Sequence, residues 1–334
     1  MSTPRRRTGT APSVVALGGG HGLAASLSAL RHVTTELTAV VTVADNGGSS
    51  GRLRQEFGAL PPGDLRMALA ALCRDDEWGQ TWAHVLQHRF ESDGPMHGHA
   101  VGNLLIVALW ELLGDAPRES GDGLVSGLDW VGRLLGAEGR VLPMATTPLD
   151  ISAVVRGTRA DAPDELTTVR GQVEVATTPG SVVSVSLEPD TPDACPEAVA
   201  AIRAADWVVM GPGSWYSSVI PHLLVPGLRQ AIEETDARVL VTLNLVAQQG
   251  ETEGLTPADL LERLGRHAPG LDLDVVLADV STVGETAADV EALERVAASY
   301  GAGLVVADVA RADAIGQHDH EKLRGAYAQI MLAT

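Results

Sequence analysis

The stretch VVALGGGHG, residues 14–22, decides the fold. Four apolar residues, typical of a buried strand, lead directly into three glycines, and residues 23–30 then place apolar side chains at helical spacing. A β-branched, apolar run follows at residues 38–43 and predicts a second buried strand. Strand, glycine turn, helix and strand in this order predict a doubly wound α/β fold with a Rossmann-like, mostly parallel sheet.

Two segments interrupt this alternation. Helical patterns at residues 63–73, 78–89 and 99–113 predict a helical subdomain over about residues 63–137. Residues 140–190 predict a β-rich insertion, with short strands at VLPMAT (141–146), LDISAVV (149–155), QVEVAT (172–177) and VVSVSLEP (182–189). Buried strands then return at residues 207–210, 239–243, 275–278 and 304–307. We expect residues 13–334 to form a single domain, preceded by a disordered tail of residues 1–12 that is not a signal peptide.

The composition is that of an acidic protein with an aliphatic core. Of the 334 residues, 45% are hydrophobic but only 3% are aromatic, and the formal net charge is −19. This charge excludes a general nucleic-acid binder, and no apolar run is long enough to predict a membrane-spanning helix. Cys73 and Cys195 are too few for a disulfide framework and suit reduced thiols. We expect a cytoplasmic protein without membrane insertion.

The glycine turn is the first candidate binding element. Glycines let the backbone approach a ligand closely, and the following helix presents free N–H groups to phosphate. The spacing differs from the dinucleotide fingerprint, so an NAD-dependent oxidoreductase is disfavoured. The alternative is a tight strand-to-helix turn that binds no ligand. The candidate residues are Gly18, Gly19, Gly20, His21 and Gly22.

A polar stretch after the second predicted strand is the next candidate. Asp45 is placed to reach a ribose or to hold Mg²⁺ together with ligand phosphates, and Asn46 is placed to bind the same ligand. We expect a flexible loop rich in donors, and Arg52 and Arg54 as a phosphate clamp. An ordinary surface loop is the alternative. The loop residues are Gly47, Gly48, Ser49, Ser50 and Gly51.

The helical segment adds four candidate ligand contacts, which are Asp64, Arg66, His99 and Asn103. Asp64 stands near a predicted helix start, where capping is the alternative role. Arg66 lies in the same first turn, which is unfavourable for a cation and therefore favours a ligand contact. His97 and His99 lack a third ligand at readable spacing, so zinc is disfavoured. His99 and Asn103 are four residues apart and share one helix face.

Two later strand ends carry further polar groups. Gly211, Pro212, Gly213 and Ser214 form a second strand-to-helix turn, which we expect in the same crevice as the first. Ser214 has neither a nucleophile elbow nor an assigned base, so we predict no catalytic residue. Ordinary polar loops are the alternative. The remaining candidates are Ser218, Asn244, Gln249, Glu251 and Thr252.

Together these motifs resemble the YvcK family, also called gluconeogenesis factors, within a superfamily that includes CofD, the 2-phospho-L-lactate transferase. The stretches that carry the resemblance are VVALGGGHGLAASLSAL, VTVADNGGSSGRLR, PPGDLRMALAAL, GHAVGNLLIVAL, GPGSWYSSVIPHLLVPGL and NLVAQQGETEGLT. The resemblance implies a protein that binds UDP-N-acetylglucosamine and acts in gluconeogenic growth, cell shape and peptidoglycan synthesis. It implies no required cofactor, and Mg²⁺ with ligand phosphates near Asp45 is left open. A homodimer and a cell-wall enzyme as partner are left open.

The chain departs from the family pattern at two places. The family has two adjacent aspartates where this chain has Asp45 and Asn46, which weakens a metal-assisted transfer reaction. A Thr-Gln-Pro-Gly-Glu-Thr run is replaced here by AQQGET, residues 247–252. A regulatory binding protein is therefore the preferred function, and a CofD-like transferase of deazaflavin coenzyme biosynthesis is the alternative.

Overall fold

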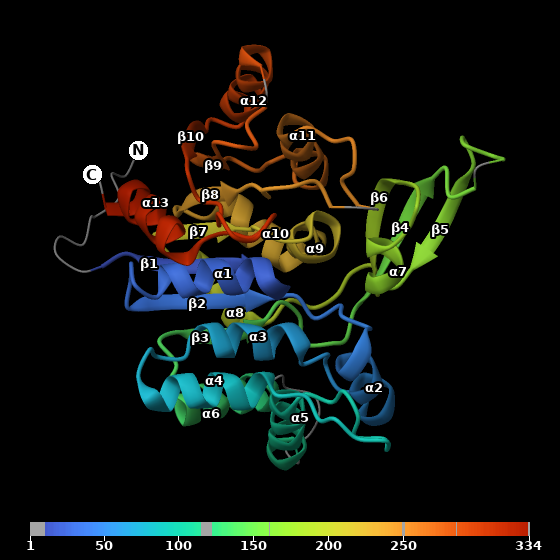
Figure 1. The fold of residues 1–334 in the computed structure, drawn as a ribbon, viewed down its shortest axis with the longest axis vertical. Coiled ribbons are helices and arrows are strands. Elements are labelled where there is room, and N and C mark those ends of the chain that lie inside the picture. Colours follow the sequence, from blue (N-terminus) through green and yellow to red (C-terminus); the bar gives the residue numbers. More distant parts are fainter. Residues whose placement is uncertain (1–10, 115–121, 160, 249–250, 285, 333–334) are drawn as a thin grey trace.

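A seven-stranded parallel sheet forms the centre of the protein (Figure 1). The computed structural model describes residues 11–114, 122–159, 161–248, 251–284 and 286–332, so most of the expected tail lies outside the described residues. The strands are β1 (Ser13–Gly18), β2 (Glu36–Val41), β3 (Arg140–Pro143), β7 (Trp207–Met210), β8 (Arg238–Thr242), β9 (Val275–Asp279) and β10 (Gly303–Ala307). The predicted α/β fold with a mostly parallel sheet is confirmed.

The strand order reverses in the middle of this sheet. The order is β10-β9-β8-β7-β1-β2-β3, so the chain runs outward from β1 in one direction and later outward from β7 in the other. β1 and β7 are neighbours, with Val14 opposite Trp207 and Leu17 opposite Met210. Ligands of doubly wound sheets bind where the order reverses, because the loops leaving the two central strands diverge there and open a crevice.

Helices cover both faces of the sheet. The helix α1 (Gly20–Leu30) packs against α13 (His320–Leu332) on the near face in Figure 1, and α8 (Pro196–Ala204) and α10 (Pro226–Glu234) pack together on the far face. The strands they cover are aliphatic and almost wholly buried, as expected for a parallel sheet. The other elements after β7 are η1 (Trp215–Val219), α9 (Pro221–Leu224), α11 (Pro257–His267) and α12 (Ala287–Ser299).

A group of helices lies below the sheet in Figure 1. The expectation of a flexible loop after the second strand was wrong, because residues 48–51 form the first turn of α2. Gly47 enters this turn in an extended conformation, and a Cβ on Gly51 would lie 2.1 Å from the Asn46 carbonyl oxygen. The glycines therefore serve a tight helix entry. The helices are α2 (Gly48–Phe57), α3 (Gly63–Ala71), α4 (Glu77–Gln87), α5 (Val101–Leu113) and α6 (Asp122–Leu135).

A three-stranded antiparallel sheet stands beside the main body (Figure 1). Its order is β5-β4-β6, from β5 (Leu166–Arg170), β4 (Asp150–Arg156) and β6 (Ser181–Glu188). The expectation for residues 140–190 was wrong in three details. QVEVAT forms the helix α7 (Gln172–Ala176), the strand β5 was not expected, and β3 joins the parallel sheet beside β2. Gly171, at a φ of 102°, turns the chain out of β5 before a second strand can form.

The helices of the described residues include none that is both long and apolar enough to cross a membrane. The arrangement as a single domain stays a prediction.

Tyr327→Phe tests the contact that holds α13 to the sheet. The Tyr327 hydroxyl lies 2.8 Å from Ser26 Oγ on α1 and 3.0 Å from Thr242 Oγ1 on β8, and all three residues are buried. We expect the free energy of unfolding in urea to fall by about 1–3 kcal/mol, because buried hydroxyls lose a shared partner. Tyr300→Phe, which removes a half-buried hydroxyl bonded to Leu261 O, should cost less. Equal losses would contradict the central role of Tyr327.

Candidate functional site

The two glycine turns touch each other where the strand order reverses. A Cβ on Gly22 would lie 2.2 Å from the Pro212 carbonyl oxygen and 2.6 Å from Gly213 Cα. Only glycine therefore lets the first turn of α1 approach the turn after β7 this closely. The contact joins the carboxyl ends of β1 and β7 into one wall.

The other side of the first turn is equally close to its neighbours. A Cβ on Gly19 would lie 2.5 Å from Asp64 Oδ2 and 2.5 Å from Thr42 Cγ2. Gly20 has a φ of 57°, a left-handed conformation that favours glycine. The turn is thus held between the second turn and the start of α3. Asp64 accepts from the Gly20 N–H, which leaves the next N–H groups of α1 for an anion.

Asn244 fixes the shape of the second turn. The Gly213 N–H donates to Asn244 Oδ1 at 2.9 Å, and Asn244 Nδ2 donates to the Gly213 carbonyl oxygen at 2.8 Å. Gly211 and Gly213 have φ values of 72° and 143°, which other residues rarely adopt. The side chain that follows β8 therefore holds the turn that follows β7.

Ser214 is held by a buried carboxylate. Its hydroxyl lies 2.6 Å and 2.7 Å from the two oxygens of Glu251, and its Oγ accepts from the Ser217 N–H at the start of η1. Burial raises the pKa of Glu251, and the hydrogen bond from Ser214 acts in the opposite direction. Thr252 supports the same segment by accepting from the Gln248 N–H at 2.8 Å. These contacts make Ser214 a structural cap rather than a free nucleophile.

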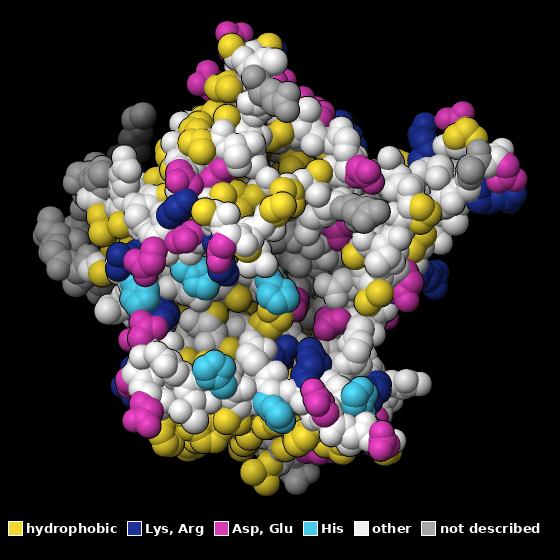
Figure 2. Space-filling model, in the orientation of Figure 1, with side chains coloured by type: hydrophobic (Ala, Val, Ile, Leu, Met, Phe, Trp, Pro, Cys, Tyr) yellow, Lys and Arg dark blue, Asp and Glu magenta, His cyan; other side chains and the backbone are white. Residues whose placement is uncertain are grey.

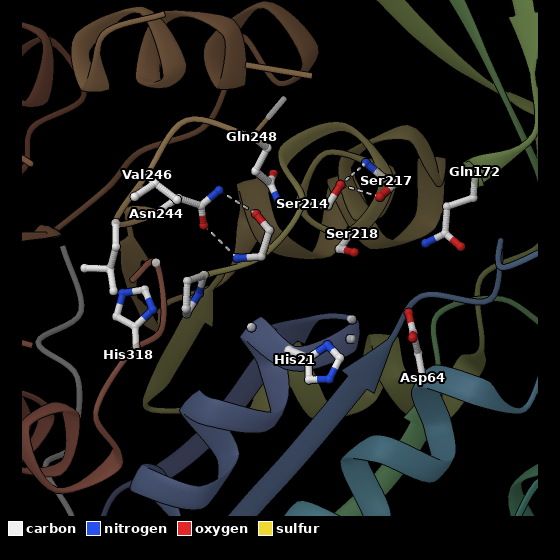
Figure 3. Close-up of a pocket in the computed structure, with 17 residues that line it drawn as sticks. His21, Asp64, Gln172, Ser214, Ser217, Ser218, Asn244, Val246, Gln248 and His318 are labelled. Atoms are coloured by element: carbon white, nitrogen blue, oxygen red, sulfur yellow. Dashed lines mark hydrogen bonds between the residues drawn. The ribbon is translucent and has the colours of Figure 1, made fainter. Parts of the chain in front are cut away.

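These turns enclose a cavity of about 330 Å³, which we call the glycine cavity. Figure 3 shows Ser214, Asn244 and Gln248 on one side, with His21 and Asp64 facing them from the other. The structure brings together ten of the candidate residues in its lining: Gly19, Gly20, His21, Gly22, Asp64, Pro212, Gly213, Ser214, Ser218 and Asn244.

A second cavity of about 230 Å³ adjoins the first, with Asp64 as the common wall. We call it the aspartate cavity. Asp45 Oδ1 accepts from the Gly47 N–H at 2.8 Å, and a Cβ on Gly63 would lie 2.8 Å from Asp45 Oδ2. The candidate residues that line it are Asp45, Gly47, Ser49, Ser50, Asp64, Arg66 and Asn103.

Asp64 is an unusual carboxyl group. Burial raises its pKa to about 7, the negative charge of Asp45 adds to the shift, and the Gly20 N–H and Arg66 oppose it. Oδ2 is buried and has no hydrogen-bond partner among the described residues. The group therefore changes charge near neutral pH, at the point where both cavities meet.

A buried polar chain supports the aspartate cavity. His99 Nδ1 lies 3.1 Å from Ser49 Oγ, and Asn103 Nδ2 donates to the same oxygen at 3.0 Å. Arg66 Nε donates to Asn103 Oδ1 at 2.9 Å. His99 precedes α5, which begins at Val101, so the predicted shared helix face is wrong, although both side chains reach Ser49 Oγ. His99 acts through Ser49 and is not itself a wall of either cavity.

Other candidates lie away from these cavities. Arg52 donates to the carbonyl oxygens of Pro95 and His97, so its guanidinium is engaged within the protein. Arg54 pairs with Asp150 instead of forming a phosphate clamp. Gly18 and Gly211 shape the ends of their strands, and Gln249 lies outside the described residues.

Asn46 also lies away from the cavities. Its Nδ2 donates to Glu174 at 3.1 Å, and its Oδ1 accepts from the Val173 N–H at 3.3 Å. Both partners belong to α7, so Asn46 fastens the small sheet to the loop after β2.

Several residues of the glycine cavity were not among the candidates, namely Gln172, Ser217, Leu245, Val246, Gln248, Gly316 and His318. His318 comes from the loop before α13, far along the chain. Asp279, at the end of β9, holds that loop by accepting from the N–H groups of Val309 and Ala310 at 2.7 Å and 2.9 Å. Burial opposes these bonds, but they lower the pKa of Asp279 overall. No local pattern in the sequence predicts this long-range placement.

No group of three metal-ligating side chains occurs in the part of the chain that the structure describes.

The family model of 2-phospho-L-lactate transferase CofD matches residues 14–318. The chain belongs to the CofD family. Putative gluconeogenesis factors of Mycobacterium tuberculosis and Mycobacterium leprae are 52% and 50% identical to it, covering 89% and 94% of this chain and 84% and 85% of theirs. A crystal structure of a UPF0052 family member from Bacillus halodurans aligns with a TM-score of 0.79 at 32% identity, over 94% of this chain and 98% of that one.

The match includes both glycine turns, the Asp45 segment and His318, so the whole wall of the glycine cavity lies within the CofD-family region. The resemblance seen in the sequence is thereby confirmed at the level of the family.

Gly22→Ala tests the contact between the two turns. The new methyl group would overlap the Pro212 carbonyl, so we expect the free energy of unfolding to fall by about 2–4 kcal/mol. Gly325→Ala on α13 is the matched control, because no atom lies within 4 Å of its Cβ position. The control should be neutral or stabilised by up to about 1 kcal/mol. Similar urea midpoints for Gly22→Ala and the native chain would show that the turns are not in contact.

Asp64→Asn tests the raised pKa. A carboxyl whose folded pKa is raised to about 7 makes the native state lose stability as pH rises from the unfolded value toward 7. The stability of the variant relative to that of the native chain should therefore increase between pH 5 and pH 8 by on the order of 2 kcal/mol. Thermal melts across this range measure the difference. Asp190→Asn, the same change at an exposed position, should show no such dependence, and a pH-independent offset for Asp64→Asn would refute the shift.

Proposed function

We propose that this CofD-family protein binds a nucleotide sugar, UDP-N-acetylglucosamine, in the glycine cavity and the aspartate cavity. The observation that carries the proposal is the contact of two glycine turns where the strand order reverses, with the N-terminus of α1 facing the cavity. Free N–H groups and the positive end of the helix favour a diphosphate at this point. Serine, asparagine and glutamine side chains around it suit hydroxyl-rich ligand groups.

The preferred role is regulation. Curated relatives are named gluconeogenesis factors, and the family resemblance links such proteins to gluconeogenic growth, cell shape and peptidoglycan synthesis. Ser214, the most obvious hydroxyl at the site, is engaged by Glu251 and Ser217. A cytoplasmic protein that reports the level of a cell-wall precursor to a cell-wall enzyme fits these features.

The alternative is a CofD-like transferase, and Asp45 and Asp64 favour it. Two carboxylates beside a phosphate site suit Mg²⁺, which binds through one or two carboxylates together with ligand phosphates. When bound there, Mg²⁺ would neutralise charge on the diphosphate. An assay with a nucleotide-activated phospho-acid donor, a deazaflavin acceptor and Mg²⁺ distinguishes the two functions, because a regulatory protein binds UDP-N-acetylglucosamine and forms no product.

Asn244→Asp tests the proposed binding by titration calorimetry with UDP-N-acetylglucosamine. The change removes the donor that holds the Gly213 carbonyl and adds a negative charge to the cavity wall. We expect the affinity for the ligand to fall at least tenfold, which corresponds to a loss of about 1.4 kcal/mol of binding free energy. Asn46→Asp is the matched control, since Asn46 faces α7, and its affinity should equal that of the native chain. No heat from the native protein at millimolar ligand would refute the proposed function.

A further inference from the structure

A third cavity of about 890 Å³ lies beside the proposed nucleotide-sugar site, between α1, α3, α4 and the loop before α13. We propose that it binds a second small molecule, with a phosphate or carboxylate group on a compact apolar body, at the same time as the nucleotide sugar. We call it the basic cavity. The inference rests on the proposed function for its neighbouring ligand, because Arg66 and Arg89 line the aspartate cavity as well.

The charge of the lining selects an anion. The protein has 43 acidic residues and only 24 basic ones, yet no Asp or Glu is among the residues that line this cavity. Two arginines and four histidines line it, including Arg66, Arg89 and His84. Figure 2 shows histidine side chains around the hollow at the centre of this face. The two arginines, with no carboxylate among the lining residues, concentrate anions at that one place in an acidic protein.

Arg66 provides an independent sign of a missing ligand. The residue is only 3% exposed, and its Nη1 is buried with no partner among the described residues. Burial and the nearby charge of Arg89 lower the pKa of Arg66 to about 10, so the group is still a cation at neutral pH. An unsatisfied donor on a buried guanidinium is costly, and a phosphate or carboxylate would satisfy it with a charge-assisted hydrogen bond.

His318 gives a second unsatisfied group, at the boundary with the glycine cavity. It is 7% exposed, lines both cavities, and has a buried Nε2 with no partner among the described residues. Burial lowers its pKa to about 4 and a hydrogen bond to the Leu243 carbonyl opposes the shift, so the ring is neutral and its Nε2 can accept a hydrogen bond from a hydroxyl or N–H group of a ligand. His21 and Gly22 also line both cavities, so molecules in the two would be neighbours.

One part of the cavity is lined by small apolar side chains. Ala70 and Ala71 on α3, Ala83 on α4, and Ala24 and Ala25 on α1 present only methyl groups to it, and Met67 adds an adaptable side chain. A ligand with an anionic group at Arg66 and Arg89 would therefore lay an apolar body along α1 and α3. A free inorganic ion would leave this part of the cavity unused.

The experiment uses 1-naphthyl phosphate as a probe, titrated into the full chain with and without saturating UDP-N-acetylglucosamine. We expect binding in both conditions and weaker binding of inorganic phosphate. Ala83→Trp should fill the apolar part and weaken the probe at least tenfold, and Arg89→Gln should do the same by removing a cation. Thr81→Trp, on the exposed side of the same helix, and Arg295→Gln, the same charge loss on α12, are the matched controls and should bind as the native chain does.

The outcomes separate this proposal from the proposed function. Probe binding without UDP-N-acetylglucosamine keeps the second site testable even if the nucleotide sugar fails to bind. No probe binding to the native chain at millimolar concentration, or equal loss in the control variants, overturns the second site. If Ala83→Trp weakens UDP-N-acetylglucosamine but not UDP, the cavity holds the sugar of the first ligand, and the second ligand is likewise excluded.

Discussion

The close approach of Gly22 to the Pro212 carbonyl is the constraint on which the site depends. A Cβ at Gly22 would overlap that oxygen at 2.2 Å, so the first turn of α1 and the turn after β7 are in direct backbone contact. The parallel pairing of β1 with β7 brings the two turns to one edge, and Asn244 then fixes the second turn from β8. Three separate parts of the chain thus form one wall, and the hydrogen bonds within it reduce the reorganisation that ligand binding costs.

The start of α3 connects this wall to the other cavities. Asp64 lies between the glycine and aspartate cavities, and Arg66, two residues later, lies between the aspartate and basic cavities. A carboxylate suits the positive end of a helix, whereas a buried cation there is unfavourable. Arg66 keeps this position through Asn103, and its remaining donor is unsatisfied. One helical turn therefore carries both a carboxylate, Asp64, and a cation, Arg66. This is how the cavity lined by arginines comes to lie beside the carboxylate pair of Asp45 and Asp64.

The sequence predicts the parallel sheet and both glycine turns because these features are local. Apolar runs and glycine clusters mark strand ends, and the parallel order brings those ends together. The prediction of QVEVAT as a strand failed because alternating valines fit a strand, while Gly171 turns the chain and Val175 alone is buried in the helix that forms. His318 could not be placed from a local pattern, because its position depends on Asp279 holding residues 309 and 310. Arg52 and Arg54 were expected at phosphate, but carbonyl groups and Asp150 bind them within the fold.

The contacts of Asn46 change how its departure from the family pattern bears on function. In the sequence, a missing second carboxylate weakens metal-assisted transfer, because Asn46 follows Asp45 directly. In the structure its amide bonds to Glu174 and the Val173 N–H, and Asp64 supplies the second carboxylate near Asp45 from another helix. An aspartate at position 46 would face Glu174 and repel it, so asparagine is the better partner for α7. The choice between regulation and transfer therefore rests on Asp45 and Asp64, and Asn46 carries no weight in it.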